Sequence, residues 1–208
     1  MFTGIIQATG AIVRAEELGF GKRLTIEAPA LGLDDVAIGD SIAINGACMT
    51  VTGKTARSFS IDVSAESLSK TAGLDRLGEV NLEKGMRLGD RIDGHLVSGH
   101  VDGTGQIVAF DQHGESYVLI IDAPAEMAKY LAYKGSVTVD GVSLTVNRVE
   151  DLTQDGVRTA CRFWINLIPH TIEVTTLRHF KPGQRVNLEI DLIARYCERM
   201  LALERPGA

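Results

Sequence analysis

The sequence predicts an all-β protein of two tandem, homologous, six-stranded antiparallel β-barrels, followed by one C-terminal helix. Three observations predict this: the chain repeats itself, each copy is a series of short strands with turn signals, and helical periodicity appears at the end of the chain. Two copies are too few for a solenoid, which needs three or more, so the repeat indicates a duplicated domain. We place the N-terminal barrel at residues 1–95, the C-terminal barrel at 96–190 and an oligomerisation helix at 191–208.

The repeat runs at a constant offset of 95 residues from residue 3 to residue 52 of the first copy. The second copy then carries extra residues around 153–158, where we expect a longer turn, and the match resumes with Asp62 against Asn166. Identical residues at the offset of 95 are Gly4 and Gly99, Thr9 and Thr104, Gly10 and Gly105, Pro29 and Pro124, Ser41 and Ser136, Gly46 and Gly141, and Thr50 and Thr145.

Each copy contains one strong hairpin signal. Residues 41–53 and 136–148 alternate apolar with small or polar side chains, and Asn45-Gly46 and Asp140-Gly141 interrupt them. These dipeptides favour the tight turn of a two-residue hairpin. Several short strands with turns between them are typical of a small closed barrel. Further strands are expected at 23–29, 58–64, 117–124 and 162–168, and short helical pieces at 64–73 and 126–133.

The C-terminal segment has a different period. Between Asp191 and Glu204, apolar residues recur at helical spacing. One apolar stripe on a terminal helix packs on its own domain or against copies of itself. The residues of this stripe are Ile193, Cys197, Met200, Leu201 and Leu203.

Composition argues against several classes of partner. The net charge is −6, Lys and Arg are scattered, and only 5% of residues are aromatic, which disfavours a nucleic-acid surface. No leader peptide or membrane span is recognisable, so we expect a cytoplasmic protein with no membrane partner. Three distant cysteines lack the spacing of a zinc site or a disulfide framework.

The middle of the chain contains two histidines and two aspartates that lie close together in sequence. His95 and His100 could ligate a metal with Asp93 and Asp102, but the spacing matches no zinc pattern. We therefore expect no metal, and we expect His95 to be a hydrogen-bonded residue of the linker between the barrels.

Five motifs carry a resemblance to a known family. They occur in order along nearly the whole chain, and together with the duplication they resemble the riboflavin synthase family, the lumazine-dismutating enzymes. The motifs are MFTGIIQ at 1–7, NGACMTV at 45–51, GHLVSGHVDGTG at 94–105, YKGSVTVDGVSLTV at 133–146 and NLEIDLIARYCER at 187–199.

The resemblance implies a reaction between two molecules of one compound. A four-carbon unit passes between two molecules of 6,7-dimethyl-8-ribityllumazine, giving riboflavin and 5-amino-6-(ribitylamino)uracil, with no cofactor. The resemblance also implies a homotrimer tied by the C-terminal helix, in which the N-terminal barrel of one chain faces the C-terminal barrel of the next. Association with lumazine synthase stays open. Two pockets of common ancestry suit two identical substrates, and holding them in the right orientation supplies much of the catalysis.

The resemblance also implies substrate-binding residues, and the repeat relates the two sets. Shifting the first set by 95 residues, and its last segment by 104, gives the second set apart from Lys134. In the first copy they are Gly4, Ile5, Ile6, Cys48, Met49, Thr50, Asp62, Val63, Ser64, Ala65, Glu66 and Ser67. In the second copy they are Gly99, His100, Val101, Lys134, Ser143, Leu144, Thr145, Asn166, Leu167, Ile168, Pro169, His170 and Thr171.

Positions that differ between the copies are the most informative about chemistry. The reaction removes a proton from the 7-methyl group of one lumazine and adds a nucleophile to the other. An imidazole suits proton transfer near neutral pH. The identity of the general base, and which barrel holds the donor, stay open. The differing pairs are Ile5 and His100, Gly39 and Lys134, Cys48 and Ser143, and Glu66 and His170. The implied catalytic residues are Ser41, Cys48, His100, Ser143, Thr145 and Asp191.

Structural roles compete with several of these assignments. Ser41 and its counterpart Ser136 could form a shared strand-end hydrogen bond. Asp191 precedes the terminal helix, where Asp is a preferred N-cap. Cys48 could be a small core residue, and Lys134 could form a salt bridge. The alternative function is a non-catalytic lumazine- or flavin-binding protein. The intact second-copy motifs favour the enzyme.

Overall fold

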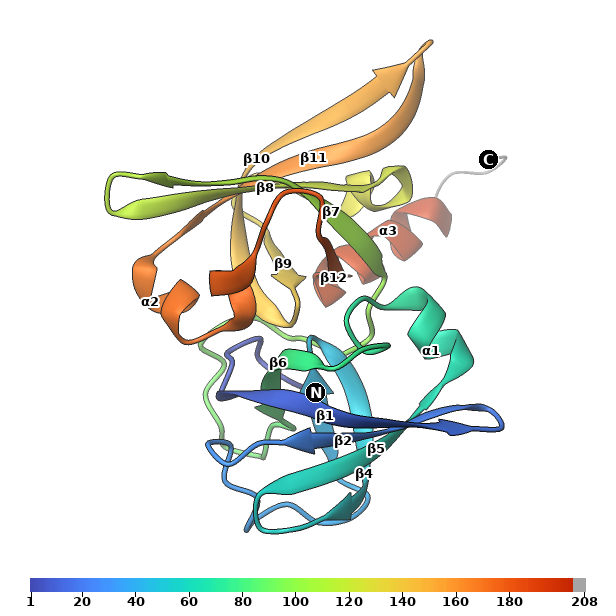
Figure 1. Ribbon diagram of the computed structural model, residues 1–208. Coiled ribbons are helices and arrows are strands. Elements are labelled where there is room, and N and C mark those ends of the chain that lie inside the picture. The colour runs from blue at the N-terminus through green and yellow to red at the C-terminus, as the bar shows by residue number, and fades with distance from the viewer. Residues whose placement is uncertain (204–208) are drawn as a thin grey trace.

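The computed structural model describes residues 1–203, and it contains two closed six-stranded barrels stacked one above the other (Figure 1). Both barrels have the same strand order, and every neighbouring pair is antiparallel, which confirms the predicted fold class. The first barrel runs β1-β2-β5-β4-β3-β6, formed by β1 (Ala8–Leu18), β2 (Gly21–Glu27), β3 (Ser41–Ile44), β4 (Ala47–Lys54), β5 (Ser58–Ser64) and β6 (Gly78–Lys84). The second runs β7-β8-β11-β10-β9-β12, formed by β7 (Gly103–His113), β8 (Ser116–Pro124), β9 (Ser136–Val139), β10 (Val142–Gln154), β11 (Val157–Leu167) and β12 (Arg185–Ile190).

Alternation along the strands decides which side chains fill the barrels. On β4, Ala47, Met49 and Val51 point inward and are buried, whereas Cys48 and Thr50 point outward. This two-residue period holds in both barrels, as expected for strands with one buried face. Each barrel therefore has its own apolar core. Polar groups remain available on the outer faces.

The two predicted hairpin turns meet at the centre of the molecule. Asn45, Gly46, Asp140 and Gly141 all have positive φ, between 45° and 82°, as a type I′ turn requires. A Cβ atom on Gly46 would lie only 2.8 Å from the backbone nitrogen of Gly141. Glycine is therefore needed at this contact between the two turns, where the barrels dock.

Buried asparagines extend this contact symmetrically. The Asn81 side chain donates a hydrogen bond to the Asp140 carbonyl at 2.9 Å, and the Asn187 side chain donates to the Asn45 carbonyl at 3.0 Å. Since these residues stand at matching positions of the two copies, the barrels are related by an approximate two-fold axis.

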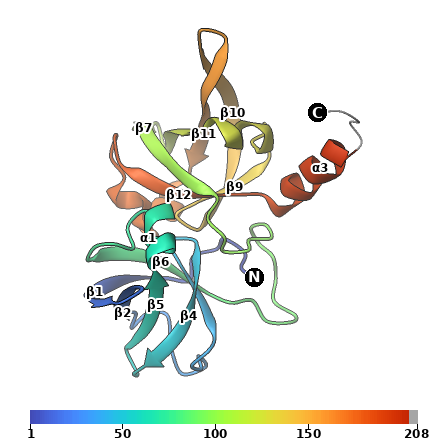
Figure 2. The ribbon, with the colours of Figure 1, turned by 90° about the vertical axis from the view of Figure 1, so that its right-hand side faces the viewer.

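The sequence predicted a longer turn at the extra residues of the second copy, and this prediction is wrong. They lengthen β10 and β11 into a two-stranded ribbon that projects beyond the barrel, with Asp155 and Gly156 in the turn (Figure 2). The antiparallel pairing continues from Val149 to Gln154, with a register shift between Leu152 and Thr153. Backbone hydrogen bonding therefore continues past the barrel wall.

Short helices connect successive strands within each barrel. The two expected helical pieces are α1 (Ala65–Lys70) and the 3₁₀ helix η1 (Ala125–Tyr130). Two more, α2 (Pro169–Glu173) and the 3₁₀ helix η2 (Thr176–His179), were not predicted. Pro169 stands in the first turn of α2, where its missing N–H has no helical partner to lose.

The predicted C-terminal helix is α3 (Leu192–Leu203), which stands at the side of the second barrel (Figure 2). Ion pairs Lys129–Glu198 and Arg195–Asp102, both at 2.6 Å, attach it to this barrel. None of its side chains is buried. Residues 204–208 of the predicted segment 191–208 lie outside the described residues. No helix among residues 1–203 is long and apolar enough to cross a membrane.

Candidate functional site

The segments that precede the two barrels, residues 3–6 and 98–101, cross over to the opposite barrel. We call them the crossing segments. The backbone N–H of Ser143 donates to the carbonyl of Gly4, and that of Cys48 donates to the carbonyl of Gly99, both at 2.8 Å. Ile6 also packs against the core of the second barrel, and Val101 against that of the first. The alignment had grouped the expected binding residues by copy, but these contacts group them across the copies.

Glycine is required where each segment crosses. Gly4 and Gly99 have φ of 75° and 80°, a conformation that residues with a side chain rarely adopt. A Cβ atom on Gly99 would lie 2.6 Å from Cys48 Cβ, and one on Gly4 would lie 2.7 Å from Ser143 Cβ. The structure thus brings the backbone of each crossing segment directly onto the β4 or β10 strand.

We define the first site face as the outer surface of the first barrel formed by Ser41, Cys48, Thr50 and Asp62, together with His100 of the crossing segment. Ser41 pairs with Thr50 across β3 and β4, and Cys48 is half-buried beside Phe2. His100 is exposed and directly follows Gly99, which contacts Cys48. The structure therefore places His100 one residue from the Gly99 carbonyl that accepts a hydrogen bond from Cys48 N.

The second site face is the matching surface of the second barrel, formed by Ser136, Ser143, Thr145 and Asn166, with Ile5 of the other crossing segment. Ser136 pairs with Thr145 across β9 and β10, as Ser41 does with Thr50. Thr145 and Asn166 are exposed, and Ile5 is 45% exposed. The two faces therefore share a frame and differ in side-chain chemistry.

His95 is the partner that distinguishes the second site face. Its Nδ1 atom lies 2.7 Å from Ser143 Oγ, within hydrogen-bonding distance. Burial of the imidazole lowers the pKa of His95, while the negative charge of Asp191 acts in the opposite direction. The sequence predicted a hydrogen-bonded His95. Its partner, 48 residues away, could not be identified from spacing.

Asp62 is held by a partner that the sequence argument missed. Arg23 donates to both carboxylate oxygens of Asp62, at 2.7 and 2.8 Å, and lowers the pKa of that carboxyl. The register pairs Arg23 with Asp62 on β2 and β5, and Val118 with Asn166 on β8 and β11. The first face therefore carries an ion pair where the second has an amide beside an apolar residue.

The side chains of the segment after Asp62 make local hydrogen bonds and ion pairs within α1. Ser64 caps α1 by accepting a hydrogen bond from Ser67 N at 3.0 Å, and Glu66 pairs with Lys70 at 2.6 Å. Exposed Ala65 lies between them in the first turn. These contacts are ordinary capping and i,i+4 interactions, so they need no ligand to explain them.

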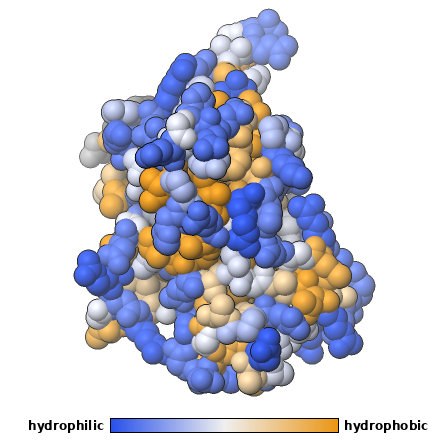
Figure 3. All heavy atoms as spheres, turned by 60° about the vertical axis from the view of Figure 1, so that its left-hand side comes forward, coloured by the Kyte–Doolittle hydropathy of each residue, from blue (hydrophilic) through white to orange (hydrophobic). Residues whose placement is uncertain are grey.

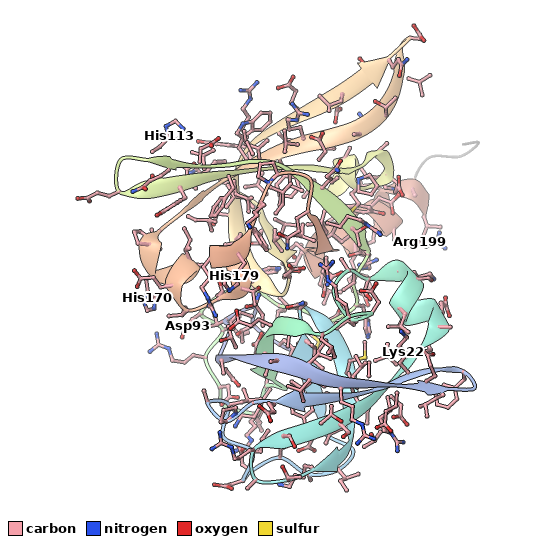
Figure 4. All side chains as sticks on the ribbon, viewed as in Figure 1. Lys22, Asp93, His113, His170, His179 and Arg199 are labelled. Atoms are coloured by element: carbon pink, nitrogen blue, oxygen red, sulfur yellow. The ribbon has the colours of Figure 1, made fainter. Side chains whose placement is uncertain are left out.

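The matching segment of the second copy forms α2 instead. Ile168 is 61% exposed, and with Pro169 it lines a cavity of 660 Å³ beside Tyr117. His170 is an exposed residue of α2 (Figure 4). The Thr171 carbonyl accepts a hydrogen bond from Thr175 at 2.6 Å. This segment thus exposes Ile168 and Pro169 where the α1 segment has Ser64 and Ala65.

Four of the expected binding residues face the barrel cores. Their side chains are at most 9% exposed, so only their backbone atoms could meet a ligand. Strand alternation explains this, because each is a neighbour of an outward-facing residue. These four are Met49, Val63, Leu144 and Leu167.

Lys134 occupies a backbone position where the other copy has glycine. Its φ is 64°, and that of Gly39 is 97°. Its side chain donates to Asn147 Oδ1 at 3.0 Å and lies over the Tyr133 ring. A left-handed lysine is strained, and such strain concentrates at functional positions. The sequence left two roles open for Lys134, a salt bridge and a contact with the substrate. These contacts do not include a salt bridge.

Asp191 and Ser41 each have a structural role. Asp191 Oδ1 accepts a hydrogen bond from Ile193 N at 2.8 Å, which caps α3 as one reading of the sequence expected. Ser41 lines a cavity of 530 Å³ together with Asp40, Lys84 and Met86. Its carbonyl accepts a hydrogen bond from Gly85 N at 3.1 Å.

Hydrophobic and hydrophilic side chains are mixed on the surface of the molecule. Hydrophobic side chains reach the surface in several separate patches among hydrophilic ones on the face shown in Figure 3. Within residues 1–203, His, Cys, Asp and Glu side chains do not gather in any group of three or more that could hold a metal ion.

This fold defines a duplicated barrel protein in which the two copies carry matching candidate site faces. The family model of the lumazine binding domain matches the chain twice, at residues 3–85 and 98–191. Relatives that are riboflavin synthases match nearly end to end. That of Photobacterium phosphoreum is 45% identical over 99% of this chain and 91% of its own length. That of Bacillus subtilis is 42% identical over 97% of this chain and 90% of its own. The chain belongs to the riboflavin synthase family of lumazine-binding proteins.

Solved structures show the same fold at lower sequence similarity. A crystal structure of LumP complexed with riboflavin has a TM-score of 0.78 at 21% identity, covering 91% of this chain and 99% of LumP. LumP complexed with 6,7-dimethyl-8-(1′-D-ribityl) lumazine has a TM-score of 0.76 at 20% identity, with the same coverage.

Proposed function

We propose that this chain is a riboflavin synthase, which transfers a four-carbon unit from one 6,7-dimethyl-8-ribityllumazine to a second. The products are riboflavin and 5-amino-6-(ribitylamino)uracil. The observation that carries this proposal is the pair of matching but chemically different faces, built by the same strands in both barrels. One compound must act as both donor and acceptor, so two related sites with different polar groups suit the reaction.

Each face would bind one lumazine. The backbone at Gly4 and Gly99 packs directly onto Ser143 and Cys48, and a planar heterocycle would lie beside these contacts. Hydroxyls suit the edge of the heterocycle and the ribityl chain, since each can donate and accept. These hydroxyls belong to Ser41, Thr50, Ser64, Ser67, Thr145 and Thr171, and Lys134 adds a cation.

Different groups would act on the two substrates. At the first face, His100 would move a proton beside the Cys48 thiol. At the second face, His95 supports the proposal that Ser143 Oγ is polarised, because its ring nitrogen lies 2.7 Å from that oxygen. An acid–base group placed in this way contributes roughly 100- to 10,000-fold to a rate. Thr145 and Asp191 would orient the intermediate.

We further propose that the working unit is a cytoplasmic homotrimer in which unlike faces of neighbouring chains enclose the two substrates. The two faces lie on the outside of their own barrels, so another chain would be needed to cover them. Support comes from α3, which exposes five large apolar side chains. They are Ile193, Tyr196, Met200, Leu201 and Leu203.

The test is a turnover assay with 6,7-dimethyl-8-ribityllumazine as the sole added substrate. Riboflavin is followed by absorbance and chromatography, with heat-denatured protein as the control. The proposal expects one riboflavin for every two lumazines consumed. Tight binding of lumazine without product would instead support the alternative function, a non-catalytic lumazine- or flavin-binding protein. LumP, which shares this fold, has been crystallised with both kinds of ligand. Association with lumazine synthase is tested separately, by co-sedimentation of the two purified proteins.

A further inference from the structure

Two buried glutamates stand at matching positions of the two barrels. Glu83 on β6 is 3% exposed, and Glu189 on β12 is 2% exposed. Burial raises the pKa of both carboxyls, and hydrogen bonds to them act in the opposite direction. A carboxylate is costly to bury unless it is fully hydrogen-bonded. The proposed reaction does not use either one, so their contacts need another explanation.

Each glutamate accepts three hydrogen bonds in the same arrangement. One oxygen of Glu83 accepts from Thr3 N and Thr3 Oγ1, both at 2.7 Å, and the other accepts from Gly4 N at 3.0 Å. One oxygen of Glu189 accepts from Ser98 N at 2.7 Å and Ser98 Oγ at 2.6 Å, and the other from Gly99 N at 2.9 Å. Both carboxylates thus bind the crossing segments.

These hydrogen bonds continue to the opposite barrel. The Gly99 residue held by Glu189 of the second barrel accepts, through its carbonyl, the hydrogen bond from Cys48 N of the first. The Gly4 residue held by Glu83 of the first barrel accepts from Ser143 N of the second in the same way. Each glutamate is therefore two hydrogen bonds away from the site face of the other barrel.

We propose that Glu189 is a positioning residue for the first site face and Glu83 for the second, so that each barrel sets the geometry of its neighbour's substrate site. Glu189 orients the segment that carries His100 onto Cys48, and Glu83 orients the segment that carries Ile5 onto Ser143. This inference rests on the proposed function for the identity of the ligand. The glutamates themselves do not touch the reacting atoms.

Glutamine is the sharpest substitution because it keeps the size of the side chain. Its amide group would put N–H donors where one carboxylate oxygen now accepts, facing the N–H of Gly99 in Glu189→Gln and that of Gly4 in Glu83→Gln. A buried donor that faces another donor destabilises that contact. Since the two variants are matched, each serves as the control for the other.

The experiment measures turnover and lumazine binding, by fluorescence titration, in double-mutant cycles. We expect Glu189→Gln to lower kcat/KM about tenfold or more, mainly through kcat and with a smaller loss of lumazine affinity. It should be non-additive with Cys48→Ser and additive with Ser143→Ala. Glu83→Gln should show the reverse pattern. Non-additivity reports shared interactions, whereas residues that act on separate sites add.

Other patterns would overturn the inference. Additivity with both partners, coupling of both glutamates to the same face, or unchanged kinetics would leave the glutamates with a purely structural role. If a glutamine variant fails to fold, Ser98→Ala and Thr3→Ala each remove a single side-chain donor and test the same crossed pattern. A wild type that binds lumazine without making riboflavin would refute the proposed activity, but the crossed pattern could still be read from binding. A wild type that binds no lumazine would refute both.

Discussion

The two barrels share a scaffold and differ where they would meet substrate. Strand order, hairpin turns and the buried glutamate contacts repeat in both copies. The first face combines Cys48 with the segment of His100, and the second combines Ser143 with His95. Duplication therefore preserved the frame and left the outward side chains to diverge. Under the proposed reaction, changes at a few outward positions would be enough to give one compound two roles.

A second difference lies where the barrels touch. Asn45 accepts a hydrogen bond from Asn81 N at 2.8 Å, and the matching Asp140 accepts from Asn187 N at 2.7 Å. Burial raises the pKa of Asp140 to about 7, with Arg76 among the groups that oppose it. The side chain that accepts this hydrogen bond is thus a neutral amide in the first copy. In the second copy it is a carboxyl group whose charge depends on pH.

The largest effect should come from separating unlike barrels of neighbouring chains. Truncation before Leu192 removes α3 and its exposed apolar side chains. We expect a folded monomer that still binds lumazine but turns it over at least about 100-fold more slowly, because reactants are no longer held together. Sedimentation and turnover are measured together, and a fully active monomer would show that one chain suffices.

The next largest effect tests whether the close contact between a crossing segment and the opposite barrel is required for stability. Gly99→Ala places a Cβ atom 2.6 Å from Cys48 Cβ and also strains a residue at φ of 80°. We expect unfolding free energy to fall by about 3 kcal/mol, since overpacking and backbone strain add. Gly89→Ala is the control, because its φ of 97° gives strain with nothing within 4 Å. Equal losses in chemical denaturation would remove the role assigned to the close contact.

Asp140→Asn makes the central contact alike in both copies. The pKa of Asp140 is raised to about 7 in the folded state, above the unfolded value of about 3.9, so the folded state holds the proton more tightly. Its contribution to stability is full below about pH 4 and is lost as the pH rises through 7. Between pH 5 and pH 8 the wild type should therefore lose roughly 2–3 kcal/mol more stability than Asp140→Asn does. Parallel pH profiles from urea denaturation would contradict this, and Asn45→Asp should introduce a similar dependence.

The smallest expected effect is a difference in kcat between substitutions in the two crossing segments. His100→Ala should lower kcat about 10- to 100-fold with little change in lumazine binding, because a proton-transfer group is lost. Ile5→Ala, at the matching position, should change kcat far less. Steady-state kinetics of the two variants decide the point, and equal effects would assign both segments a packing role.

Local patterns in the sequence predicted much of the fold. Alternation marked Cys48 and Thr50 as a pair on one side of a strand, and Asn45-Gly46 marked a tight turn. These features depend on residues close together in the chain, so they can be read without a structure. Extra residues near 153–158 were placed correctly but assigned to a turn, because an extended ribbon and a loop differ only in pairing.

By itself, the sequence determined that the chain is duplicated, that its copies are β-barrels, and which positions differ between them. Only the tertiary structure decided that residues 4–6 lie on the second barrel and residues 99–101 on the first. It also decided that His95 meets Ser143 and that Arg23 holds Asp62. The physical reason is that an alignment of copies establishes equivalence, not contact. Contacts between distant segments depend on the path of the linker and on how two finished barrels dock.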